Sequence, residues 1–180
     1  PCGHGAPPGT PVLHSGTRLD VTDLVYSALT QAPSQDHNMT QLNSVTGPID
    51  TADLGFTLMH EHVMVAASGL YDYYPDLLGD NREERAIECL RKAKAGGIDT
   101  MVDATTFDLG RNAPMLQRVS AASGVKIINT TGWWLDVPRF LNGVSANQMA
   151  REFIRDIEEG FRGTDVKAGI IKCAAKPFLD

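Results

Sequence analysis

Short apolar runs alternate with amphipathic segments along most of this chain, and that alternation limits its possible folds more than any other feature. The four runs, rich in β-branched residues, occupy 56–60, 98–105, 125–132 and 167–174. The three amphipathic segments between them, 81–96, 112–124 and 145–161, place apolar residues at helical spacing. Consecutive strands joined through helices predict a parallel sheet with right-handed crossovers. The expected fold class is α/β, as either a doubly wound open sheet or the first half of a (β/α)8 TIM barrel.

The ends of the predicted helices carry recognisable capping residues. Asp80 is the expected N-cap of the first helix, and Gly96 is expected to stop it. The second helix has a glycine, Gly124, directly after its last turn. The third helix opens with Ser145 and has Gln148 three residues later, which is the sequence pattern of a capping box.

Polar side chains gather where the predicted strands end. They are His60, His62, Asp103, Thr106, Asn129, Trp134 and Lys172. No glycine-rich phosphate loop of the usual spacing follows any of the four strands, so the sequence gives no reason to expect a nucleotide-binding open sheet. In a closed barrel the carboxyl ends of the strands form one mouth, where active sites are built. We therefore expect the first half of a barrel, with a site at this mouth.

The chain divides into two parts by composition. Residues 1–40 are rich in Pro, Gly, Ser and Thr, which predicts a poorly ordered, disordered leader. Residues 41–180 carry the strand and helix pattern and form the expected half-barrel. Because the chain begins at Pro1 and stops at Asp180 directly after a predicted strand, we expect it to be truncated relative to a longer parent protein.

Charge and composition narrow the classes of partner. The formal net charge is -6 and no run of Lys or Arg occurs, so we expect no nucleic acid and no membrane surface among the partners. The sequence contains no apolar run long enough to span a bilayer and no signal peptide, so the expected location is cytoplasmic. The cysteines Cys2, Cys89 and Cys173 are too few for a disulfide framework, and we expect Cys89 and Cys173 to be reduced and buried.

The stretch TLMHEHVMV places two histidines on one face of a predicted buried strand. Side chains alternate faces along a strand, so His60 and His62 point the same way. Either they are hydrogen-bonded core or surface histidines, or they bind a metal ion. Burying two imidazoles side by side without a partner is costly, and neutral imidazole suits zinc, cobalt or manganese ions. The pair is therefore a candidate metal site.

Lys172 ends the apolar run GIIK of the last predicted strand. One interpretation is a lysine whose ammonium reaches solvent beyond the strand end. Alternatively, a desolvated lysine has a lowered pKa and becomes a nucleophilic amine. Such an amine could form a Schiff base, as in an aldolase, although that role leaves the paired histidines unexplained. It could also capture carbon dioxide, giving a carbamate whose two oxygens can bridge two metal ions.

Several of these segments together resemble the phosphotriesterase family of the amidohydrolase superfamily, a group of (β/α)8-barrel metal hydrolases. The matching stretches are GFTLMHEH (55–62), GIDTMVDATTFDLGR (97–111), TGWWLDVP (131–138) and KAGIIKCA (167–174). They occur in the family's order and at about its spacing. The resemblance runs from Gln41 to the end of the chain and covers close to the first half of such a barrel.

The resemblance implies roles for four residues. His60 and His62 correspond to the strand-one histidines that bind the more buried metal, and Lys172 to the lysine whose carbamate (N6-carboxylysine) bridges both metals. Trp134 corresponds to an aromatic residue that lines the leaving-group side of the substrate pocket. The family implies two divalent metal ions, with zinc expected, a small-molecule ester substrate, and a homodimer for the full-length parent. Related lactonases tend to carry tyrosine at the position of Trp134, which favours aryl phosphotriesters as substrates.

The implied reaction is hydrolysis of organophosphate triesters by a metal-bridged hydroxide. In the family, an aspartate on the eighth strand accepts the proton and histidines on strands five and six complete the second metal site. None of them has a counterpart here, because Asp180 comes too early and Asp103 is on the wrong strand. We therefore expect the isolated chain to be inactive and prone to association. The alternatives are a lactonase or carboxylesterase on the same scaffold, and a non-catalytic metal-binding half-barrel.

Overall fold

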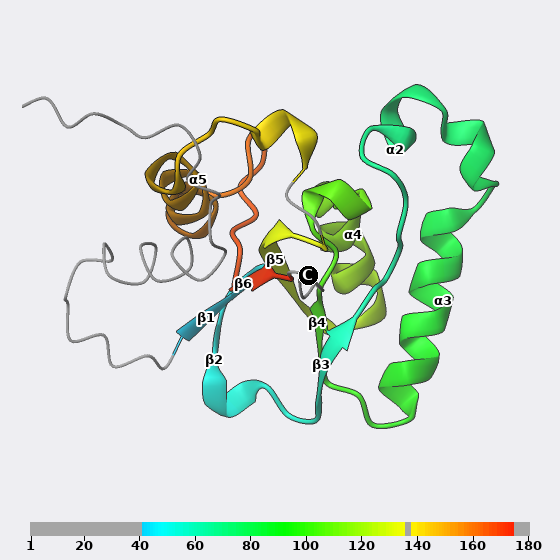
Figure 1. Cartoon of the computed structure of the whole chain (residues 1–180). Helices are drawn as coiled ribbons and strands as arrows, with labels where there is room; N and C mark the ends of the chain where they lie inside the picture. The colour runs from blue at the N-terminus through cyan, green and yellow to red at the C-terminus, as the bar shows by residue number, and fades with distance from the viewer. Residues whose placement is uncertain (1–40, 136–137, 175–180) are drawn as a thin grey trace, which may run out of the picture.

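A computed structural model of the chain describes residues 41–135 and 138–174. Its centre is a parallel sheet of four strands, which are hydrogen-bonded in the order of the chain. The strands are β3 (Thr57–Glu61), β4 (Thr100–Asp103), β5 (Lys126–Trp133) and β6 (Ile170–Cys173). A doubly wound sheet reverses its strand order at a switch point, whereas a barrel adds each strand beside the previous one. The observed order is that of a barrel segment, which confirms the predicted half-barrel (Figure 1).

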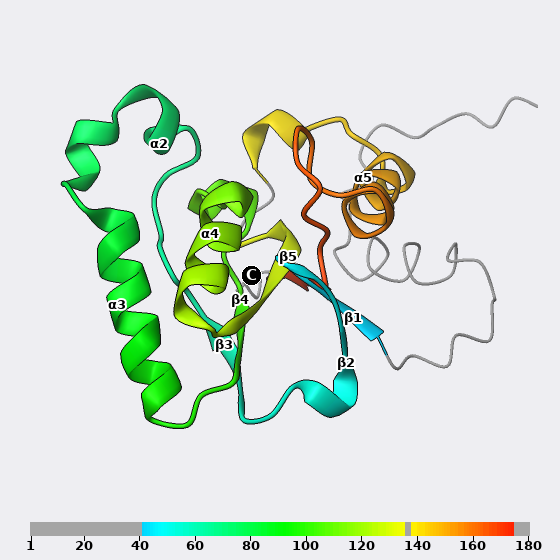
Figure 2. The same ribbon diagram turned by 180° about the vertical axis from the view of Figure 1, so that it is seen from behind.

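Three long helices connect these strands. They are α3 (Arg82–Ala95), α4 (Ala113–Ser123) and α5 (Ala146–Glu158). The helices α3 and α4 lie side by side on one face of the sheet, and the reverse view in Figure 2 shows the same pairing. A short helix α2 (Leu70–Tyr73) and four 3-10 turns complete the connections: η1 (Thr51–Asp53), η2 (Pro75–Leu78), η3 (Phe107–Leu109) and η4 (Arg139–Leu141). None of the helices in residues 41–135 and 138–174 has the length and hydrophobicity of a membrane-spanning segment.

Most of the predicted helix ends are confirmed, but the start of α3 is wrong, and α5 ends at Glu158, before the predicted last residue Phe161. Ser145 and Gln148 form both hydrogen bonds of a capping box at the start of α5. Gly124 follows α4 with a φ of 76°, a left-handed conformation that glycine adopts without strain. The N-cap of α3 is Asn81, not Asp80, and its side chain makes no capping hydrogen bond. Its left-handed backbone, with a φ of 55°, connects the preceding turn to the helix.

The sequence interpretation missed a hairpin before the first barrel strand. It consists of β1 (Gln41–Ser44) and β2 (Gly47–Asp50), which pair antiparallel. Between them, the Val45 backbone N–H donates to the carbonyl of Ile127 at 2.8 Å, which joins the hairpin to β5. The Asn43 amide donates to the carbonyls of Ile157 and Ala168, both at 3.1 Å. The hairpin therefore binds to the last turn of α5 and to the segment between α5 and β6.

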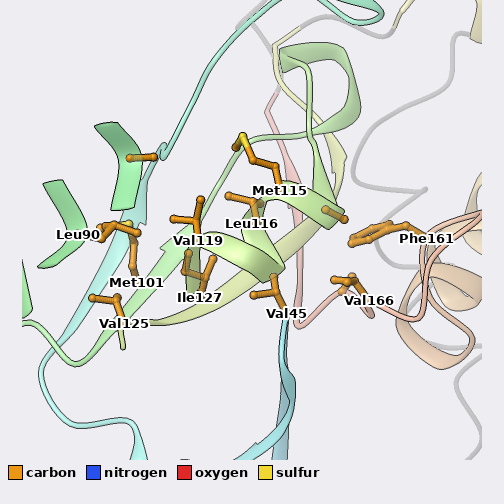
Figure 3. Packing of buried hydrophobic residues seen from close by; sticks show 13 residues of the cluster. Val45, Leu90, Met101, Met115, Leu116, Val119, Val125, Ile127, Phe161 and Val166 are labelled. Carbon is orange, nitrogen blue, oxygen red and sulfur yellow. The ribbon is translucent and has the colours of Figure 1, made fainter. Parts of the chain in front are cut away.

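The main hydrophobic core lies between the sheet and the helices α3 and α4. Figure 3 shows its buried side chains, which include Leu90 from α3, Leu116 and Val119 from α4, and Met101 and Ile127 from the sheet. A second cluster surrounds Trp133 and contains Leu141, Met149 and Phe153. The two clusters hold the helices on the outside of the sheet, so the strand ends remain available for a site.

Two burial predictions are wrong. The strand β3 was expected to be buried on both faces, but His60 and His62 are exposed and Met59 is 69% exposed. The cause is the position of β3 at the edge of the sheet, where no further described strand covers it. Cys89 was expected to be buried, yet it lies on an exposed position of α3, and Cys173 is partly buried. The predicted leader, together with Cys2, lies outside the described residues.

Candidate metal centre

The structure brings the two histidines of the TLMHEHVMV stretch together. The rings of His60 and His62 have centroids 5.5 Å apart and meet edge to face at 66°. His60 belongs to β3 and His62 follows its last residue. Two imidazoles that share a tetrahedral zinc ion with Zn–N bonds near 2.0–2.1 Å have ring centres roughly 5 Å apart. The spacing of this pair therefore fits two ligands of one cation.

Lys172 lies on β6, at the opposite edge of the sheet from β3. It extends to the rim, which is the end of the sheet formed by the carboxyl ends of the strands. Its ammonium donates to the carbonyl of Ala104 at 3.1 Å. Its positive charge helps to lower the pKa of His62, after the larger effect of burial. Burial also lowers the pKa of Lys172, while the carboxylates of Asp108 and Asp103 oppose that change. The charge of the lysine therefore acts on the histidine pair, and burial makes the lysine easier to deprotonate than an exposed one.

A glycine allows the strand that carries Lys172 to lie against β5. Gly132 is the register partner of Lys172 and has a φ of 106°. A Cβ atom at Gly132 would overlap the backbone carbonyl of Lys172. A side chain at position 132 would therefore push the two strands apart or rotate the peptide.

Thr105, in the loop after β4, makes the closest polar contact to the histidine pair. Its hydroxyl oxygen Oγ1 lies 2.9 Å from Nδ1 of His62. Its backbone N–H donates to Oδ1 of Asp103 at 2.9 Å. Asp103 is completely buried, and burial raises the pKa of its carboxyl. The sequence interpretation named Asp103, the last residue of β4, and Thr106 in the following loop, but missed Thr105.

Trp134 lies at the end of β5, as predicted, and its ring is partly open to solvent. Its side chain is 48% exposed, whereas Trp133 is completely buried. The backbone N–H of Trp134 donates to the carboxylate of Asp108, which in turn accepts the hydroxyl of Thr106. The loop after β4 therefore fixes the backbone that carries Trp134. The sequence interpretation did not identify Asp108, because its partner is far away along the chain.

Asn129, the remaining polar residue predicted at a strand end, makes no contact with the histidine pair in the part of the chain that the structure describes. Asn129 is completely buried in β5, where its side-chain oxygen accepts the backbone N–H of Thr130. It lies in register beside Asp103 on β4. None of the hydrogen bonds of Asn129 reaches His60, His62 or Lys172.

The protein ligands around this rim fit part of a metal centre. Among residues 41–135 and 138–174, no group of three or more His, Cys, Asp and Glu side chains is placed to hold a metal ion. The available donors are the two imidazoles and Lys172, which becomes an oxygen donor only as a carbamate. Zinc accepts imidazole nitrogen and carboxylate-like oxygen, so the chemistry of this donor set is compatible with a divalent cation. The set fills only some of the coordination positions.

Comparison with known proteins identifies the family. The sequence model of the phosphotriesterase family matches residues 40–178. The chain belongs to the phosphotriesterase family. One family relative, the phosphotriesterase homology protein of Mycobacterium tuberculosis strain H37Rv, is 44% identical over 147 residues, which are 76% of this chain and 45% of that protein. The aryldialkylphosphatase of Saccharolobus solfataricus is 36% identical over 130 residues, covering 71% of this chain and 41% of that protein.

A solved structure of a phosphotriesterase has the same fold. The phosphotriesterase from Mycobacterium tuberculosis superposes with a TM-score of 0.67 at 42% sequence identity, covering 75% of this chain and 45% of that chain. The four-stranded parallel sheet is therefore part of the phosphotriesterase TIM barrel, and the predicted fold class and family are confirmed. The chain spans less than half the length of these phosphotriesterase relatives.

Proposed function

We propose that the protein to which this chain belongs is a metal-dependent hydrolase of organophosphate triesters that uses two divalent cations, with zinc as the expected metal. The observation that carries the proposal is the contact between the rings of His60 and His62 at the end of β3, together with Lys172 on β6, whose ammonium donates to the carbonyl of Ala104 beyond β4. Membership of the phosphotriesterase family supports hydrolase activity. The similarity to a protein named aryldialkylphosphatase supports a phosphotriester as the substrate.

His60 and His62 would hold one cation through ring nitrogens, and Lys172 would bridge to a second one as N6-carboxylysine. When bound, such a pair of cations supplies a nucleophilic hydroxide at neutral pH and polarises the phosphoryl oxygen. The ring of Trp134 is exposed at the same end of the sheet, where it can pack against an aryl leaving group.

Lys172 has a chemical task of its own before any substrate binds. The neutral amine nitrogen attacks the carbon of carbon dioxide, a new N–C bond forms, and the nitrogen releases one proton. The product is a carbamate with one negative charge. Because burial lowers the pKa of Lys172, a larger share of the side chain is the neutral amine that this step requires.

The direct test combines metal content with activity. The 180-residue chain and any longer protein that contains it are purified, loaded with zinc or cobalt, and assayed on an aryl phosphotriester and a lactone. We expect the longer protein to bind two metals and to hydrolyse the phosphotriester. The variants His60→Ala, His62→Ala and Lys172→Ala should lose metal and activity, whereas the control Lys167→Ala should keep both. Two bound metals without turnover would refute the proposal.

The same measurements separate the competing functions. Faster turnover of the lactone than of the phosphotriester would indicate a lactonase. For the isolated chain we expect no turnover, since its described ligands fill only part of two metal sites. Turnover by the isolated chain would contradict that expectation. Size-exclusion mass tests the further proposal that the whole protein is a homodimer.

A further inference from the structure

We propose that Asp108 is a positioning residue for Trp134: by holding the backbone of Trp134, it determines how well the site accepts an aryl leaving group. The inference rests on the proposed function, because it concerns the selectivity of that hydrolytic site for one class of phosphotriester.

The loop after β4, residues 104–108, contacts two of the candidate metal ligands. The carbonyl of Ala104 accepts the ammonium of Lys172 at 3.1 Å. The next residue, Thr105, places its hydroxyl oxygen 2.9 Å from Nδ1 of His62. The start of this loop is therefore joined to the side chains that would hold the cations.

The end of the same loop binds the backbone of Trp134. Both carboxylate oxygens of Asp108 accept the Trp134 N–H, at 3.1 and 3.0 Å. Asp108 also accepts the hydroxyl of Thr106, which is completely buried. The carbonyl of Thr106 accepts the backbone N–H groups of Leu109 and Arg111, which closes the turn that carries the carboxylate. Asp108 is thus held by its own loop, and a carboxylate forms stronger hydrogen bonds than a neutral acceptor.

The backbone of Trp134 limits where its ring can lie. Trp134 directly follows β5, and Gly132, two residues earlier, is in register with Lys172. The side chain of Trp134 is 48% exposed, whereas Trp133 is packed in the second hydrophobic cluster. A half-exposed ring receives less support from packing, so its position depends more on the backbone beside it. Ordering a loose side chain costs free energy on binding, and a ring that is already held contacts an aryl group without that cost.

The first experiment tests the hydrogen bond in the 180-residue chain. The chain has two tryptophans, so ¹⁵N-tryptophan labelling gives two backbone N–H signals, and Trp134→Phe identifies the signal of Trp134. Hydrogen exchange of this N–H is then followed by NMR. We expect protection in the wild type and a loss of about 10- to 100-fold in Asp108→Ala.

Two further variants show whether the carboxyl oxygen is the cause. Asp108→Asn keeps an oxygen that accepts the Trp134 N–H and should retain most of the protection. Asp80→Ala, which removes an exposed acid elsewhere, should match the wild type. Circular dichroism confirms that each variant is folded. An unprotected Trp134 N–H in the folded wild type would overturn the inference.

The second experiment measures selectivity in a longer protein that contains this chain. Two phosphotriesters are compared that differ only in the leaving group, which is aryl in one and alkyl in the other. Asp108→Ala should raise the KM for the aryl ester by about 2- to 10-fold, the value of one aromatic contact. Its kcat should stay nearly unchanged, because binding that is common to the ground state and the transition state affects KM. The KM for the alkyl ester should change less, and Asp108→Asn should restore the aryl KM.

A double-mutant cycle shows whether Asp108 acts through Trp134. Trp134→Ala should itself raise the aryl KM, and Asp108→Ala should add no further increase in that background. Additive effects, or equal losses for the two esters, would refute the positioning role while the proposed function stands. If the wild type hydrolyses neither ester, the proposed function fails and the selectivity role fails with it.

Discussion

Both carboxylate oxygens of Asp108 accept the backbone N–H of Trp134, at distances of 3.1 and 3.0 Å. The contact joins the loop after β4 to the end of β5 and holds the exposed tryptophan in place. We predict that Asp108→Ala loosens this segment and increases acrylamide quenching of tryptophan fluorescence. Trp133 is completely buried and contributes little to quenching. Asp80→Ala, which removes an exposed acid elsewhere, is the control, and equal quenching of both variants would contradict the prediction.

The pKa of His62 is lowered in the folded protein, so the stability of the fold depends on pH in a predictable direction. Burial, followed by the charges of Lys172 and His60, lowers this pKa below its usual value of 6.5. The folded state therefore binds fewer protons than the unfolded state, and the stability contributed by neutral His62 is complete above pH 6.5. It is lost as the pH falls from 6.5 through the folded pKa.

Removing the charge of Lys172 should raise the pKa of His62. We predict that Lys172→Gln shifts the NMR titration midpoint of His62 upward, and that Lys167→Gln, which changes a lysine outside the rim, leaves it in place. The stability of Lys172→Gln should also fall less steeply below pH 6.5. A His62 midpoint that does not respond to Lys172→Gln would show that the two groups do not interact.

The capping box of α5 should contribute measurably to stability. Ser145→Ala removes the hydroxyl that accepts the backbone N–H of Gln148 and that also donates to the Gln148 side chain, leaving that N–H with only the Ser145 carbonyl as acceptor. We predict a loss of about 1 kcal/mol, which lowers the Tm by about 2–4 °C for a chain of this size. The exposed Ser68→Ala should leave the Tm unchanged. Differential scanning calorimetry distinguishes the two outcomes.

The core between the sheet and α4 should be sensitive to cavity formation. Leu116 is 2% exposed and packs within the main cluster. We predict that Leu116→Ala lowers the free energy of unfolding by about 2–5 kcal/mol. Leu77 is 75% exposed, so Leu77→Ala should change the free energy of unfolding by less than about 0.5 kcal/mol. Urea titration followed by circular dichroism measures both, and similar losses would place Leu116 outside the effective core.

The fold could be predicted wherever the signal was local. The β-branched runs, the glycine stops and the Ser145–Gln148 pair each depend on neighbouring residues, and the structure confirms their elements. The β1–β2 hairpin was missed because its strands are only four residues long, and it is held by contacts such as Val45 with Ile127. The exposure of β3 was mispredicted since burial depends on which strands lie beside it.

In the candidate site, too, local sequence patterns were predictable and contacts between distant residues were not. Alternation along a strand was enough to predict that His60 and His62 share a face, and the ring contact supports this. Thr105 and Asp108 were missed because their partners, His62 and Trp134, are 43 and 26 positions away. Threonine and aspartate in loops commonly bond to their own backbone, so their presence alone does not indicate a role in a site.

The close approach at Gly132 restricts how this protein could be diversified in the laboratory. A randomised library that covers the rim would naturally include position 132, since it lies in register with Lys172. Every non-glycine codon there introduces a Cβ atom into the space of a neighbouring peptide. Such clones would be lost to misfolding before their selectivity could be screened. Keeping this codon constant while varying position 134 concentrates the search on variants that still fold.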